Sequence, residues 1–245
     1  MEISLAAEPI FHIGSFTVTN TLLSSWIAVL ILVIIAFAIR RKVRVVPKGL
    51  QNLAEVVLEY FLKLTDTVTQ SRKQSVKFFP VVMTIFLFIL VSNYLGLFPG
   101  FGAIGINEIH DGHEVFVPIL RTVNSDLNVT LALAIISVMA TNFVAILLIG
   151  FVKTTKRFIN LKNPIFTFVG FLEFISELAK FISFSFRLFG NIFAGEVLLV
   201  VISSLMPFIA PLPFYFLELF VGLIQAFVFA VLTLVFMKVA AEEAH

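Results

Sequence analysis

A single arginine in the middle of a long apolar run is the residue of this sequence most able to do chemistry. Arg187 lies within residues 181–193, FISFSFRLFGNIF, which are mostly aromatic or aliphatic. Placing a guanidinium at the centre of a bilayer costs from about 3 to more than about 10 kcal/mol. Such a group persists only where it faces water, an anion or both, so we expect Arg187 to face one of these.

Polar residues recur around Arg187 at helical spacing. At about 100° per residue, the residues within about 40° of the arginine are Glu173, Ser176, Lys180, Ser183 and Asn191. Glu196 lies about 180° away, on the opposite face of the helix. Glu173 and Glu196 are therefore displaced from the arginine in opposite directions. Two offset, half-length polar routes with a fixed cation between them fit this geometry better than one continuous pore.

A later apolar segment adds Glu218 and Gln225, which are seven residues apart and share one helical face. We expect an outer route to be lined by Asn191, Glu196, Glu218 and Gln225. We expect an inner route to be lined by Glu173, Glu177, Ser176 and Ser183.

Each of these groups also has a structural interpretation. The residues of the outer route could tie helices together, and Glu173, Glu177 and Lys180 could form an ion network near the membrane surface. Small residues are expected to let neighbouring helices approach closely. They are Gly190, Ala194, Gly195 and Gly222.

No other motif indicates catalysis. The sequence has no Walker loop, Rossmann fingerprint or nucleophile elbow, and the absence of cysteine excludes thiol nucleophiles and Cys-ligated metals. His110, His113 and Glu114 lie close together but lack a helical HExxH frame, so we interpret them as part of a solvated loop. The sequence therefore predicts no cofactor, no metal site and no catalytic residue in this chain.

The composition predicts a membrane protein. Of 245 residues, 60% are hydrophobic and 13% are charged, whereas an average soluble domain has about 25% charged residues. The mean hydropathy is +1.07, which excludes a soluble globule. The net charge of +2 does not indicate nucleic-acid binding, because the basic residues flank apolar runs instead of forming one basic face.

The apolar runs are long enough to cross a bilayer core of about 30 Å, which needs about 20 helical residues. The predicted membrane segments are 21–39, 79–98, 129–152, 164–206 and 208–240. The fourth is about twice as long as one straight crossing requires, so we expect it to be tilted, bent or folded back. Residues 1–20 are expected to form an outer N-terminal segment, and residues 47–76 an amphipathic segment along the inner surface.

The basic residues predict the orientation. They concentrate between the first two spans and after the third, whereas the loop 99–128 contains only Arg121. Because loops rich in Lys and Arg stay inside, we expect the N-terminus outside and the C-terminus in the cytoplasm. The acidic start, with basic residues behind the first apolar run, argues against a cleaved signal peptide. The prediction is an all-α integral membrane protein with five to six membrane helices.

Residues 187–196, RLFGNIFAGE, closely resemble subunit a of rotary F-type ATP synthases. Residues 223–237, LIQAFVFAVLTLVFM, resemble that family's second long helix, and residues 92–100, SNYLGLFPG, and 125–134, SDLNVTLALA, are also similar. The resemblance extends from about residue 79 to the C-terminus. At one position many bacterial members carry histidine where this chain has Glu218, a carboxyl with a different intrinsic pKa, which leaves the pH range of the outer route open.

The resemblance implies that the last two long helices form a steeply tilted hairpin against a ring of c subunits. It implies one copy per complex in the plasma (inner) membrane of a bacterium, with the c-ring, the b subunit stalk, the remaining ATP synthase subunits and membrane lipid as partners. Arg187 would be the essential ion-coupling residue between two half-channels. Whether the ion is a proton or sodium depends on the c subunit.

Two alternatives stay open at this point. The chain could be an independent secondary transporter or ion channel in which Arg187 binds an anionic substrate. It could also be a purely architectural membrane subunit, in which Arg187 supports assembly alone. Ion flux measured with and without a c-ring separates these alternatives from the function that the resemblance implies.

Overall fold

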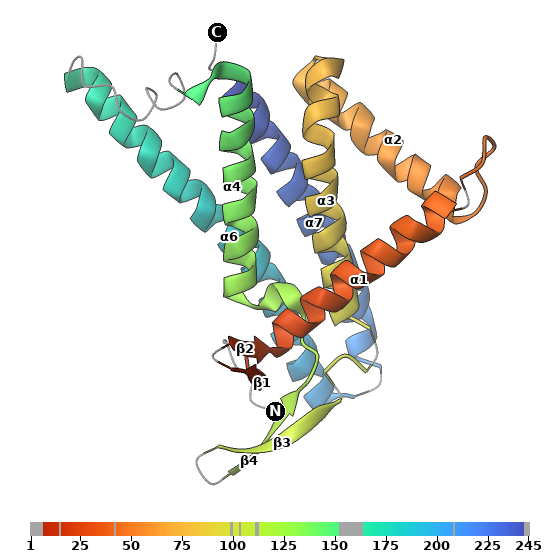
Figure 1. Cartoon of the computed structure of the whole chain (residues 1–245). Helices are drawn as coiled ribbons and strands as arrows, with labels where there is room; N and C mark the ends of the chain where they lie inside the picture. Colours follow the sequence, from red (N-terminus) through yellow and green to blue (C-terminus); the bar gives the residue numbers. More distant parts are fainter. Residues whose placement is uncertain are drawn as a thin grey trace. The chain divides into compact units, whose positions relative to one another are not determined.

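The computed structural model describes residues 7–14, 16–41, 43–98, 100–102, 104–110, 113–151, 164–207 and 209–242. Its long helices, labelled in Figure 1, are α1 (Asn20–Arg41), α2 (Leu50–Thr69), α3 (Arg72–Gly96), α4 (Leu127–Ile149), α6 (Pro164–Leu205) and α7 (Pro211–Glu242). The short elements are β1 (Pro9–Ile13), β2 (Phe16–Thr19), β3 (Gly105–His110), β4 (His113–Pro118) and the 3-10 helix η1 (Val123–Ser125).

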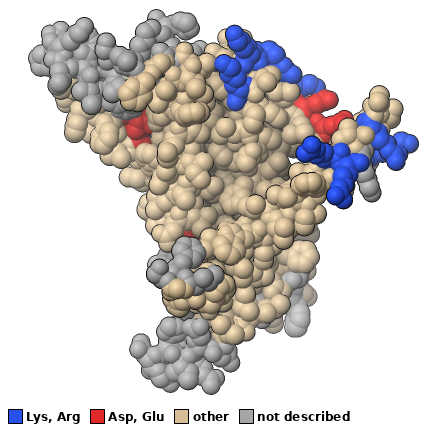
Figure 2. Space-filling view, viewed as in Figure 1, with Lys and Arg blue, Asp and Glu red and all other residues tan. Residues whose placement is uncertain are grey.

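Among the described residues, five helices are long and apolar enough to cross a membrane: α1, α3, α4, α6 and α7. α1 illustrates their character: Trp26, Leu30 and Phe37 are exposed, and only 11% of its most apolar stretch is buried. Apolar surface of this extent is stable against lipid tails and not against water. Figure 2 shows one face of the molecule, on which charged side chains occupy few places. The expected all-α membrane fold is confirmed.

The described residues contain two short β-hairpins that were not predicted from the sequence. β1 pairs with β2 and β3 pairs with β4, both antiparallel. His110 and His113 were interpreted as part of a loop, but they lie opposite each other on β3 and β4. The sequence contained the signal, because an Asp-Gly pair between two apolar runs favours a tight hairpin turn, and Asp111 and Gly112 stand between these strands.

The amphipathic segment expected at 47–76 is divided between two helices. α2 ends at Thr69, and Gln70 adopts the left-handed conformation with φ of 54°. The backbone N–H of Gln70 donates to the Asp66 carbonyl at 2.9 Å, which satisfies one of the last carbonyls of α2. α3 begins two residues later, at Arg72.

The chain divides into two compact units, and parts of α3, α4, α6 and α7 belong to each. One unit combines Val45–Ile85, Leu131–Phe186 and Val228–His245. In its core Phe184 of α6 stacks on Phe229 of α7, with ring centroids 4.7 Å apart. Earlier on α6, Lys180 lies over the ring of Phe236, later on α7. The two helices are therefore antiparallel in this unit.

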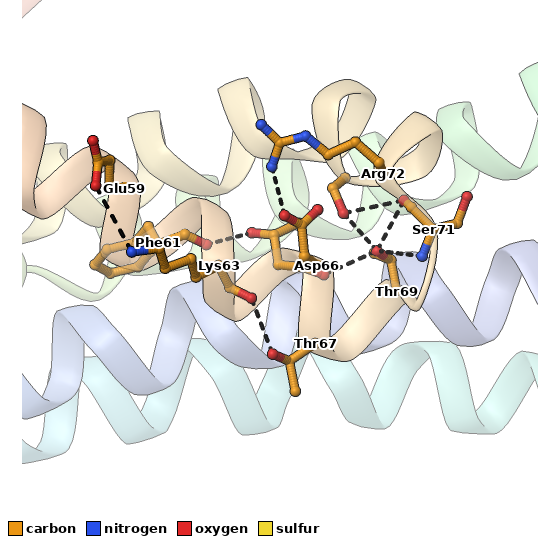
Figure 3. A network of polar contacts seen from close by, with 10 residues as sticks. Glu59, Phe61, Lys63, Asp66, Thr67, Thr69, Ser71 and Arg72 are labelled. Carbon is orange, nitrogen blue, oxygen red and sulfur yellow. Dashed lines mark hydrogen bonds and ion pairs between the residues drawn. The ribbon is translucent and has the colours of Figure 1, made fainter.

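The turn between α2 and α3 contains a network of polar contacts (Figure 3) and is also tied to α7 within this unit by Lys238. The hydroxyls of Thr69 and Ser75 are 2.6 Å apart, and Lys238 Nζ donates to the Thr69 carbonyl at 2.8 Å. Arg72 forms an ion pair with Asp66. The Ser75 hydroxyl, followed by Arg72, holds the pKa of the Asp66 carboxyl below its ordinary value, although partial burial opposes this shift.

The other unit combines Met1–Arg44, Phe86–Thr130 and Arg187–Phe227. Its interior contains many buried polar groups, which are stable there only when they are hydrogen-bonded. The Thr21 hydroxyl donates to Asp126 Oδ2 at 2.8 Å, and the Ser24 hydroxyl accepts the backbone N–H of Arg121 at 3.1 Å. The start of α1 is therefore fastened to the segment that connects β4 with α4.

Candidate functional site

Arg187 and Asn191 lie one turn apart on α6 and are both exposed. Their neighbours Leu188 and Ile192 are 1% and 5% exposed. The apolar face of this part of α6 is thus packed into its unit, and the polar face points away from the interior. That Arg187 acts on a charged group of a partner stays a prediction.

Glu196 lies further along α6 and contacts a second arginine. Glu196 Oε1 is 3.8 Å from Nε of Arg121, whose side chain is only 6% exposed. Sequence reasoning noted Arg121 merely as the one basic residue of an outer loop. Nothing local to Arg121 indicates a contact with α6, because the pairing depends on how the β4–η1 connection packs.

Glu218 of α7 is buried and lies directly against α6. A side chain at Gly195 would overlap the Glu218 carboxylate, so the two helices touch at this point. The structure therefore brings Glu218 to the residue that precedes Glu196. Gln225, two helical turns beyond Glu218, is half-buried.

Two buried asparagines, which sequence reasoning missed, connect α3, η1 and α7 in the same unit. Asn124 Nδ2 donates to Asn93 Oδ1 at 2.7 Å, and Asn93 Nδ2 donates to the Gly222 carbonyl at 3.0 Å. A Cβ at Gly222 would lie 3.2 Å from Asn93 Cβ. The available signal was Asn93 itself, because an amide inside an apolar helix requires a hydrogen-bond partner.

The expected inner-route residues belong to the other unit. Glu177 is buried and accepts a hydrogen bond from Lys180 Nζ at 2.6 Å. Glu173 is half-buried, whereas Ser176 and Ser183 are exposed. Glu177 and Lys180 therefore form one ion pair in this region, with side chains 9% and 17% exposed.

The glycines expected to permit close helix approach differ in what a side chain at each position would contact. Gly195 contacts Glu218, and Gly222 contacts Asn93, as described above. At Gly190, nothing in the described chain lies within 4 Å of the position a Cβ would take. The described residues also contain no group of three or more His, Cys, Asp or Glu that could hold a metal ion.

Comparison with known proteins gives the family. A family model described as ATP synthase A chain matches residues 22–238. The chain belongs to the ATP synthase A chain family. Campylobacter jejuni subsp. jejuni serotype O:23/36 (strain 81-176) has an ATP synthase subunit a that is 35% identical over 237 residues, covering 96% of this chain and 91% of the relative. The Campylobacter fetus subsp. fetus (strain 82-40) ATP synthase subunit a is 33% identical and covers 100% of this chain and 99% of the relative. The Syntrophobacter fumaroxidans protein of the same name is 34% identical, and the match covers 95% of this chain and 88% of the relative.

Membership in the ATP synthase A chain family confirms the resemblance to bacterial F-type subunit a. The chain is therefore a component of a multisubunit ATP synthase and takes part in proton translocation by its membrane sector. Its described part contains five apolar helices long enough to cross a bilayer, and it is a multi-pass protein of a bacterial inner membrane.

Proposed function

We propose that this chain is the stator subunit, held fixed against a rotating c-ring, that provides two offset half-channels separated by Arg187. Ions pass through these half-channels to and from carboxylates of the c-ring, so that ion flow is coupled to rotation and ATP synthesis. The position of Arg187 carries the proposal. It is exposed on an apolar helix whose adjacent residues Leu188 and Ile192 are buried. An exposed guanidinium on such a helix can face a negatively charged group of a partner in the membrane.

The outer half-channel is proposed to use Asn191, Glu196, Glu218 and Gln225. A proton that enters there neutralises an acidic side chain of a c subunit, and a neutral acid is far less costly in lipid than an ionised one. After the ring turns, the proton leaves by an inner half-channel that uses Glu173, Glu177, Ser176 and Ser183. Because basic loops stay inside, the N-terminus is outside and the C-terminus is cytoplasmic in this proposal.

Arg187 separates the two routes in this mechanism. Its guanidinium stays protonated below about pH 12, so it cannot relay a proton from one route to the other. It instead keeps an approaching c-subunit carboxylate ionised. One charge that crosses 100 mV releases about 2.3 kcal/mol, and a leak past the arginine would dissipate that energy. Rotation is then the only path by which a proton crosses.

Substitution of Arg187 in the whole complex, reconstituted in vesicles, tests the proposal. We expect Arg187→Ala to abolish ATP-driven proton pumping. Arg187→Lys should fail as well, because an ammonium group loses its proton more readily when desolvated. Arg40→Ala removes an exposed cation at the end of α1 and serves as the matched control, which should pump normally. Full pumping by either Arg187 variant would refute the proposed role.

The same assay separates the alternatives. An independent transporter or channel predicts ion flux from the purified chain alone, whereas the proposed function requires the c-ring. A purely architectural subunit predicts that Arg187→Ala lowers the amount of assembled complex but leaves each assembled complex fully coupled. Pumping is therefore measured per assembled complex, with and without added c-ring.

A further inference from the structure

Arg121 is a buried cation in the unit that also contains the exposed Arg187, and its backbone N–H is hydrogen-bonded to α1. Its N–H donates to Ser24 Oγ at 3.1 Å, and the nearby Asp126 accepts the Thr21 hydroxyl at 2.8 Å. Both anchoring residues belong to the first turns of α1. The guanidinium of Arg121 therefore extends from a backbone that has little freedom to move.

A buried guanidinium needs a negative charge beside it, because it remains protonated at any physiological pH. Glu196 supplies that charge, with Oε1 at 3.8 Å from Nε of Arg121. The Glu196 side chain is 27% exposed, and its Oε2 is buried without a hydrogen-bond partner in the part of the chain that the structure describes. One oxygen of Glu196 thus faces the cation, and the other is a buried acceptor that no described residue uses.

Glu218 approaches the same stretch of α6 from α7. Its carboxylate lies against Gly195, and its side chain is buried. Among the described residues, no ion pair is found for Glu218. Two neighbouring carboxyl groups repel each other when both are ionised, so one of them tends to be protonated. A cation beside one of the two favours the ionised form of that one. Here the cation lies beside Glu196, and Asp126, five residues after Arg121 in the chain, accepts a hydrogen bond from Thr21.

We propose that Arg121 is a positioning residue of the outer half-channel: it holds Glu196 in place as a permanent carboxylate and leaves Glu218 as the carboxyl that exchanges protons. This inference rests on the proposed function and deepens it, because it gives the two outer carboxylates different tasks. Arg121 acts through Glu196 and does not itself carry the proton.

The first test is Arg121→Gln in the whole complex, reconstituted in vesicles. We expect ATP-driven proton pumping to slow roughly tenfold to a hundredfold, as misplaced groups near a reacting centre commonly cause. Pumping should stay coupled to ATP hydrolysis, because Arg187 is unchanged. Arg121→Lys keeps the cation and should recover most of the rate. Arg41→Gln, at the exposed end of α1, is the control and should pump normally.

The second test asks whether Arg121 acts through Glu196. Without the cation, Glu196 can take up a proton, so Arg121→Gln should change the pH profile of pumping. The double variant Arg121→Gln/Glu196→Gln should lose this change and pump no more slowly than Glu196→Gln alone. If Arg121 has only a structural role, Arg121→Gln should slow pumping equally at every pH, and Arg121→Lys should not recover the rate. The losses of pumping rate caused by Arg121→Gln and Glu196→Gln should then add in the double variant. Any of these three results would overturn the inference.

The outcome also distinguishes this inference from the proposed function. If Arg187→Ala abolishes pumping while Arg121→Gln pumps at the normal rate, only the role of Arg121 fails. If Arg187→Ala pumps normally, the proposed function itself fails.

Discussion

Replacing Gly195 by alanine tests the contact between α6 and α7. A Cβ at this position would overlap both carboxylate oxygens and the carboxyl carbon of Glu218. The Glu218 side chain is only 6% exposed, so little free space surrounds it. Because the overlapping atoms are the end of a flexible side chain, the carboxylate should move while the helices stay in place.

The expected cost follows from overpacking. Inserting one methyl group into a filled site typically costs about 1 to 3 kcal/mol, part of which is the strain of an unfavourable side-chain rotamer. About 1.4 kcal/mol corresponds to a factor of ten in an equilibrium constant. We therefore expect the equilibrium constant for unfolding to rise by about fivefold to a hundredfold. Gly195→Ala should therefore lower the thermal stability of the chain in detergent. It should also slow proton pumping by the reconstituted complex, because Glu218 is displaced.

A double-variant comparison makes this reasoning refutable. Glu218→Ala removes the overlapping atoms, so Gly195→Ala should cost no further stability in that background. Gly190→Ala, at a site on α6 with nothing in the described chain within 4 Å, is the matched control and should not lower stability. If Gly195→Ala is as stable as the unaltered chain, or equally harmful with and without Glu218, the contact does not have the assigned effect.

Three further predictions concern other contacts. Asn93→Ala removes a buried amide with two hydrogen bonds and should lower the free energy of unfolding by about 1 to 3 kcal/mol, measured by thermal unfolding in detergent. Ser137→Ala removes a buried hydroxyl pair with Thr233 at 2.7 Å and should cost about 0.5 to 1.5 kcal/mol in the same measurement; an unchanged unfolding temperature would contradict this. Because the Ser75 hydroxyl lowers the pKa of Asp66, the ionised carboxylate stabilises the α2–α3 turn above about pH 4, and this stability is lost as the pH falls through the lowered pKa. Amide hydrogen exchange at the turn should show this loss, and Asp66→Asn should remove the pH dependence.

The functional site divides into residues that the sequence reveals and residues that it does not. Arg187 stands out because a charge inside an apolar run is costly in any fold. Arg121 and Asn124 lie in a connecting segment where polar residues are common, so their residue types do not indicate a role in the site. Their roles depend on contacts with Glu196 and Asn93, which follow only from the packing of distant segments.

The membrane fold is a property of the sequence alone. In lipid each segment must satisfy its backbone hydrogen bonds within itself, so a sufficiently long apolar run becomes a helix whatever its neighbours do. Packing is different, because it depends on residues far apart in the chain. The sequence marks Gly190, Gly195 and Gly222 alike as small, yet the structure places Glu218 against Gly195, Asn93 against Gly222 and nothing in the described chain within 4 Å of a Cβ at Gly190. Only tertiary structure could make that distinction, because the neighbours of a glycine come from other helices.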